Sequence, residues 1–104
     1  PLLFSSTLKP SVMKVTVRVF ADLVPVIGRK HHVELDDGAT VGILTSKIAK
    51  KAGQRRRGYL GHYRIIGGDL AILVNGRNID LLEGLDTPLS DGAEVVFMPP
   101  AAGG

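Results

Sequence analysis

The sequence contains no cysteine and no tryptophan, and only 5% of its 104 residues are aromatic. Without cysteine the chain can form no disulfide, thiolate-bound zinc site, iron–sulfur cluster or cysteine nucleophile. No apolar run approaches the ~18 residues that a membrane-spanning helix needs, so we expect no membrane span. The length suits a single domain, and the 44% hydrophobic content is high enough to form a folded core.

The motifs of self-contained enzymes are also missing. The Gly-Gly pair at 67–68 and the Asn-Gly pair at 75–76 lack the spacing of a phosphate-binding loop, and no serine lies in a nucleophile-elbow motif. His31 and His32 are adjacent, so on a strand they would point to opposite faces and could not bind one metal ion together. We therefore predict a protein that is not catalytic alone and holds no metal or cofactor.

Positive charge is concentrated in the middle of the chain. The net charge is only +3, yet residues 38–68 contain no acid and seven basic residues: Lys47, Lys50, Lys51, Arg55, Arg56, Arg57 and Arg64. Such a stretch could bind an acidic protein surface or a nucleic acid. A solvated loop is the better interpretation, because only Tyr59 and Tyr63 are available to stack on bases. We therefore expect no nucleic-acid partner.

The first twelve residues differ from the rest of the chain. They have no basic start and no long apolar region, and so do not resemble a signal peptide. They also lack strand or helix periodicity, and we interpret 1–12 as a flexible arm or a cloning remnant. We expect the folded domain over 13–98 and an extended tail over 99–104. Because no export signal is present, the expected location is the cytoplasm.

Hydrophobic periodicity in the first half predicts a hairpin followed by a helix. Residues 14–20 alternate polar and β-branched apolar side chains, which is typical of a half-buried strand, and 31–35 would return from it. Thr40 is placed to cap a helix whose apolar residues recur at helical spacing. Gly53 is suited to end that helix in the left-handed conformation.

The second half predicts further strands and a loop. Residues 54–69 are typical of a long irregular loop, 70–74 form an apolar run before the Asn75-Gly76 turn, and 93–98 form the last strand. The fold class is therefore α+β, with one helix covering one face of a sheet. We expect the first and last strands, which are the most apolar, to lie side by side in the centre and to pair in parallel.

The last six residues form an unusual tail, PPAAGG at 99–104. Fully extended, it could reach roughly 20 Å beyond Met98. Glycine has no side chain, so the tail could enter a channel too narrow for other residues. A Gly104 carboxylate would become an acyl donor only after adenylation by ATP converts one oxygen to a leaving group. A sulfur or amine nucleophile could then take the acyl group.

Five segments in a fixed order and spacing carry a family resemblance: VRVFA at 17–21, DGATV at 37–41, VNG at 74–76, TPLSDGAEV at 87–95 and PPAAGG at 99–104. Together they make the chain, from about Lys14 to Gly104, resemble the MoaD/ThiS family of ubiquitin-like sulfur carriers. The similarity is to its MoaD-like branch, the small subunit of molybdopterin synthase. The resemblance implies a ubiquitin-like β-grasp fold, with a mixed four- to five-stranded sheet and one main helix packed across it.

The resemblance also implies a reaction cycle. A MoeB-like adenylating enzyme would use ATP to activate Gly104, and sulfur transfer would give a C-terminal thiocarboxylate. The tail would then insert into a MoaE-like large subunit and deliver sulfur for the dithiolene of molybdopterin. The remaining site residues follow by position: Pro100, Ala101, Ala102 and Gly103 in the partner's channel, and Phe97 and Met98 against the partner.

Two departures from the family pattern keep alternatives open. Ala101 stands where relatives often carry a larger residue, and the basic stretch 53–68 has no match in the pattern. The first alternative is a ubiquitin-like modifier, joined through Gly104 to lysine side chains of target proteins. Another is the thiamine-thiazole sulfur carrier, although that branch tends to be shorter. A third is a small RNA-binding domain that uses the arginines at 55–57.

Overall fold

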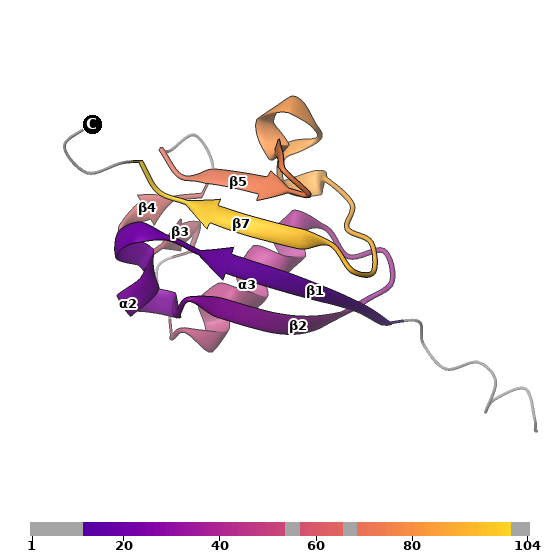
Figure 1. Ribbon diagram of the computed structural model, residues 1–104, viewed down its shortest axis with the longest axis horizontal. Coiled ribbons are helices and arrows are strands. Elements are labelled where there is room, and N and C mark those ends of the chain that lie inside the picture. Colours follow the sequence, from indigo (N-terminus) through magenta and orange to yellow (C-terminus); the bar gives the residue numbers. More distant parts are fainter. Residues whose placement is uncertain (1–11, 54–56, 66–68, 101–104) are drawn as a thin grey trace, which may run out of the picture.

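The computed structural model describes residues 12–53, 57–65 and 69–100. A five-stranded sheet in the order β2-β1-β7-β5-β6 forms its centre, and one helix, α3, crosses a single face of that sheet (Figure 1). The strands are β1 Val12–Val19, β2 Lys30–Asp36, β3 Tyr59–Leu60, β4 Tyr63–Arg64, β5 Ala71–Val74, β6 Arg77–Asn78 and β7 Glu94–Met98. The helices are the short 3-10 turns η1 Ala21–Leu23, η2 Ile79–Leu81 and η3 Gly84–Asp86, with α2 Val24–Ile27 and α3 Val41–Lys51.

The first and last strands pair in parallel at the centre of the sheet, as predicted. Val17 is the register partner of Val95, and Val19 is the partner of Phe97. All four side chains are fully or almost fully buried on the side of α3. Parallel strands are typically covered by other elements of the fold. Here α3 covers the face formed by the alternating apolar residues of β1 and β7.

The α3 helix begins and ends as its sequence predicts. The Thr40 hydroxyl oxygen accepts a hydrogen bond from the Ile43 backbone N–H at 3.3 Å, which satisfies one of the free donors of the first turn. Gly53, just past the end, has φ +74°, a conformation that costs glycine little. The helix buries Val41, Leu44 and Ile48 against the sheet. No helix in the described ranges is long and apolar enough to cross a membrane.

The structure adds two pieces of local order that periodicity did not predict. Pro25 lies in the first turn of α2, where a missing N–H costs little. The expected irregular loop contains the antiparallel pair β3–β4. The Asn75-Gly76 turn, with φ +50° and +85°, joins β5 to β6 as predicted.

Phe97 occupies the centre of the core, and the prediction that it faces a partner is wrong. Its side chain has no exposed area, because the two-residue alternation of β7 directs Val95 and Phe97 toward α3. Met98 points the other way and is 44% exposed. Only Met98 of this predicted pair can present its side chain to another protein.

We predict that Phe97→Ala lowers the free energy of unfolding by about 3–5 kcal/mol, because it opens a cavity in a fully packed site. The matched change Met98→Ala, one residue further along the strand, should alter it by less than about 0.5 kcal/mol. Urea denaturation followed by circular dichroism measures both. Equal losses for the two variants would contradict the assignment of Phe97 to the core and of Met98 to the surface.

Candidate functional site

The end of β7 leads directly into the predicted tail. β7 is bonded to β1 on one side and β5 on the other, and the Phe20 backbone N–H donates to the Phe97 carbonyl oxygen at 3.2 Å. Pro99 is buried whereas Pro100 is exposed, so the chain leaves the surface of the domain between these two prolines. Because proline has no N–H to donate, strand pairing ends there.

Pro99 and Pro100 form the base of the predicted tail. Pro100 is the last described residue, and the predicted site residues Ala101, Ala102, Gly103 and Gly104 lie outside the described ranges. Met98, Pro100 and the surface around them form the described part of this candidate site. A partner that bound the tail would contact this surface.

An apolar strip flanks the base of the tail on the face of the sheet opposite α3, which we call the open face. The strip consists of Ala71, Leu73, Val96 and Met98. Ala71 is the register partner of Met98, and Leu73 is the partner of Val96, so the four side chains lie on one face of adjacent strands. Phe20, 43% exposed, lies where β1 ends beside β7. Partly exposed apolar side chains grouped in this way are typical of a protein contact surface.

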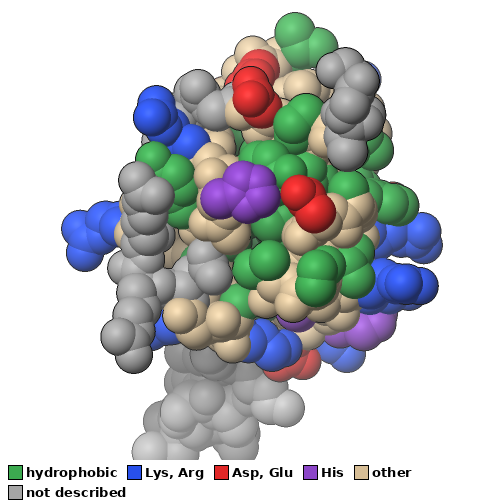
Figure 2. Space-filling view, turned by 90° about the vertical axis from the view of Figure 1, so that its left-hand side faces the viewer, with side chains coloured by type: hydrophobic (Ala, Val, Ile, Leu, Met, Phe, Trp, Pro, Cys, Tyr) green, Lys and Arg blue, Asp and Glu red, His purple; other side chains and the backbone are tan. Residues whose placement is uncertain are grey.

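The end of the molecule near the tail has a mixed surface. Hydrophobic side chains surround a histidine and an acidic side chain near its middle, and Lys and Arg side chains lie toward its sides (Figure 2). On the open face the apolar strip stops at a salt bridge between Arg18 and Glu94, with 2.9 Å between Nε and Oε2. Both side chains are about half exposed, so the pair contributes ~0.2–1 kcal/mol and mainly marks the border with the charged half of the sheet.

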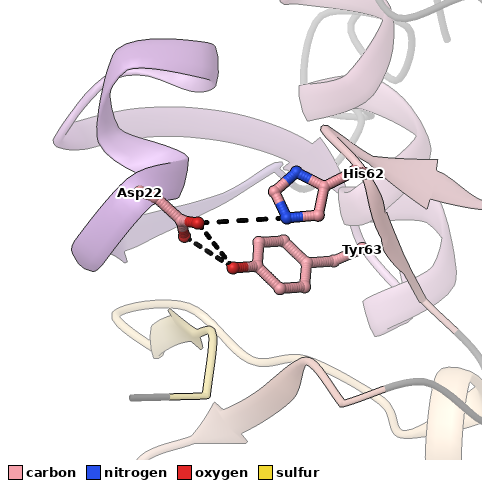
Figure 3. Close-up of polar contacts among 3 residues, drawn as sticks. All are labelled: Asp22, His62 and Tyr63. Atoms are coloured by element: carbon pink, nitrogen blue, oxygen red, sulfur yellow. Dashed lines mark hydrogen bonds and ion pairs between the residues drawn. The ribbon is translucent and has the colours of Figure 1, made fainter. Parts of the chain in front are cut away.

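A cluster of three polar residues fastens β4 to the turn after β1. The Tyr63 hydroxyl lies 2.7 Å from both carboxylate oxygens of Asp22, and His62 Nε2 lies 3.9 Å from Asp22 Oδ2 (Figure 3). The His62 and Tyr63 rings are in contact, with centroids 4.2 Å apart. The hydrogen bond to the Asp22 carboxylate favours the neutral phenol and raises the pKa of Tyr63 above its usual value.

Gly61 allows the β3–β4 turn to pack closely against η1 and α2. Its φ is +61°, and a Cβ at this position would lie 3.2 Å from the Leu23 side chain and 3.6 Å from that of Val26. A larger residue would be strained and would push the turn away from η1 and α2. The cluster was not predicted, because Asp22 and Tyr63 are far apart in sequence and no spacing rule connects them.

The described ranges contain no group of three or more His, Asp or Glu side chains that could hold a metal ion. The Asp22 cluster is exposed and lies on the surface rather than in a cleft.

The sequence from residue 17 to residue 104 matches the model of the ThiS family, and the match includes the diglycine. The chain belongs to the ThiS family. Small archaeal modifier protein 3 of Haloferax volcanii is 37% identical over 94 residues, which cover 88% of this chain and 100% of that protein. ThiS-type proteins of this kind are small carriers that are not catalytic on their own, in agreement with the prediction at this level.

Solved structures of relatives have the same architecture. Small archaeal modifier protein 1 from Methanosarcina acetivorans is 29% identical with a TM-score of 0.67, covering 90% of this chain and 99% of that one. A chain in the complex of subunits 1 and 2 of the molybdopterin-converting factor from Helicobacter pylori is 28% identical with a TM-score of 0.57, covering 88% and 100%. The ubiquitin-like β-grasp fold is thus confirmed, while membership of the ThiS family does not by itself select the MoaD-like branch.

We predict that Asp22→Asn lowers the pKa of Tyr63 toward its usual value of about 10, because the neutral amide no longer favours the protonated phenol. In the unmodified protein this hydrogen bond stabilises the fold below the pKa of an unfolded tyrosine, and the contribution is lost as the pH rises through the higher folded value. The Tyr63 Cζ resonance followed by NMR against pH measures the shift. Asp86→Asn, at another exposed acid, should leave it unchanged; equal effects of the two variants would contradict the assignment.

Proposed function

We propose that this ThiS-family chain carries sulfur on its C-terminal glycine and donates it to molybdopterin synthesis as the small subunit of a synthase. The observation that supports this most is the family match through residue 104, combined with a β7 strand that delivers the chain to the surface at Pro100. The other elements of the domain would hold the tail base in place, and the activating chemistry would belong to a partner enzyme.

The proposed activation is a balanced two-step exchange at the Gly104 carboxyl group. One carboxylate oxygen attacks the α-phosphorus of ATP, forming an acyl adenylate and releasing pyrophosphate. Hydrogen sulfide or an equivalent sulfur nucleophile then attacks the acyl carbon and displaces AMP, which leaves a thiocarboxylate. A MoeB-like adenylating enzyme would supply the ATP site, so that this chain contributes the acceptor carboxylate and no bound cofactor.

The surface around the tail base supports a role for a partner protein. A relative of this chain is found in a complex of subunits 1 and 2 of the molybdopterin-converting factor of Helicobacter pylori. In our proposal a MoaE-like subunit covers the apolar strip and admits the narrow end of the tail, Pro100 through Gly104, into a channel. Met98 is the exposed apolar residue of the strip nearest the tail, so its burial would contribute to the interface.

A second function shares the same first step. The 37% identity with small archaeal modifier protein 3 favours a modifier that is joined to target proteins. In that case a lysine amine would displace AMP and form an isopeptide bond with Gly104. A stable complex with a MoaE-like protein would favour the sulfur carrier, whereas conjugates of higher mass that need Gly104 would favour the modifier.

The first step can be tested by pyrophosphate exchange with the adenylating enzyme of the source organism. We expect the full chain to support exchange of labelled pyrophosphate into ATP, and a variant lacking Gly103 and Gly104 to lose it by at least about 100-fold, since the acceptor carboxylate is displaced. The variant should keep its thermal midpoint, because the core residues in the described ranges all precede the deleted pair. Exchange at the full rate with the truncated chain would contradict the proposal.

Partner docking can be tested with one charge placed in the apolar strip. We predict that Met98→Asp weakens binding to a MoaE-like subunit about tenfold or more, because the carboxylate would lose its hydration in the interface. Leu81→Asp is the matched control, since Leu81 is 83% exposed in η2 and lies outside the strip. Calorimetric titration gives both affinities. Similar losses for the two variants would argue against docking on the strip.

A further inference from the structure

A groove runs between the outer strand β2 and the helix α3, away from the apolar strip. It has a volume of about 630 Å³ and a floor that includes Val33 and Ile48. Lys47 and Lys51 of α3 flank this floor. Lys14, His32 and Glu34 also line the groove, from strand positions that alternate toward the open face, where Lys14 is the register partner of Glu34. The proposed tail chemistry makes no use of this groove, and β2 lies at the edge of the sheet with no further strand beside it in the described ranges.

The backbone of β2 presents hydrogen-bonding groups to this groove. The Val19 N–H donates to the Arg29 carbonyl oxygen at 2.9 Å, whereas the Thr16 N–H donates to the Ala93 carbonyl oxygen on the other side of β1. Odd-numbered residues of β1 and β2 therefore bond to each other. Because backbone groups alternate in direction along a strand, those of His32 and Glu34 point away from β1. The Glu34 carbonyl oxygen confirms this direction by accepting a hydrogen bond from Lys47 Nζ at 2.9 Å.

The positive charge around the groove favours an acidic partner at the β2 edge. Three lysines line the groove against one acid, Glu34, and none of the three forms an ion pair among the described residues. Lys30, also exposed, lies at the start of the same strand. A second copy of this chain would bring equal positive charge to the edge, whereas an acidic segment would find cations along it.

We infer that the β2 edge is a docking site for an extended acidic peptide segment of a partner protein, which adds to the sheet as a sixth strand. Its backbone would bond to His32 and Glu34, and every second side chain would enter the groove over Val33 and Ile48. Acidic residues of the segment would pair with Lys47 and Lys51. Lys47 would exchange its bond to the Glu34 carbonyl oxygen for a carboxylate, which frees that oxygen for the added strand.

The probe is a capped peptide in which alternating valines and threonines are flanked by two glutamates on each side. On titration at low salt, we expect the backbone amides of His32 and Glu34 to shift in NMR spectra of the full chain and to become more protected from hydrogen exchange. Lys51→Glu should weaken binding about tenfold or more. Lys50→Glu, an equal charge change on an exposed neighbour that does not line the groove, should weaken it by less than about threefold.

A third variant tests the backbone pairing itself. His32→Pro removes an outward N–H without removing a bond to β1, so it should abolish binding while amide shifts away from β2 stay in place. Three results would overturn the proposal: no response of the His32 and Glu34 amides at millimolar peptide, equal losses for Lys50→Glu and Lys51→Glu, or shifts that depend on protein concentration without peptide. The last would show that a second copy occupies the edge.

Discussion

The parallel pairing of β1 with β7 is the interaction on which the rest of the structure depends. It joins the two ends of the domain, with Val17 beside Val95 at its centre. Such a long-range contact carries the entropy cost of closing the intervening chain, and the buried apolar residues of both strands offset that cost. Since β7 is also bonded to β5, the base of the tail is fixed from two sides. The chain becomes free of the sheet only at the prolines, which cannot continue the ladder.

This arrangement separates stability from recognition. The face that packs on α3 contains the fully buried residues, including Phe97, and the open face contains the apolar strip and the charged pair of Arg18 and Glu94. Met98 of the strip directly precedes the base of the tail at Pro99 and Pro100, so a partner that bound the tail would cover the strip as well. β1 separates the β2 edge from β7 (Figure 1). A segment bound at that edge would therefore leave the apolar strip uncovered.

The fold was largely predictable because its main signals are local. Alternation in β1, the Thr40 cap and the Asn75-Gly76 turn each indicated an element that the structure confirms. The parallel pairing of β1 and β7 was predicted because these are the most apolar strands. The predicted role of Phe97 was wrong. Its position near the tail suggested an exposed side chain, whereas the alternation of β7 directs that side chain into the core. The contact between Asp22 and Tyr63 could not be predicted, since it depends on how the β3–β4 turn packs in three dimensions.

In the proposed function, the reactive group of this protein is the carboxylate of Gly104. Intact mass measured after incubation with ATP, sulfide and the adenylating enzyme of the source organism tests it most directly. We expect a mass increase equal to the replacement of one oxygen by sulfur, located by fragmentation at Gly104. An unchanged mass, with the same enzyme preparation active on another carrier, would contradict it.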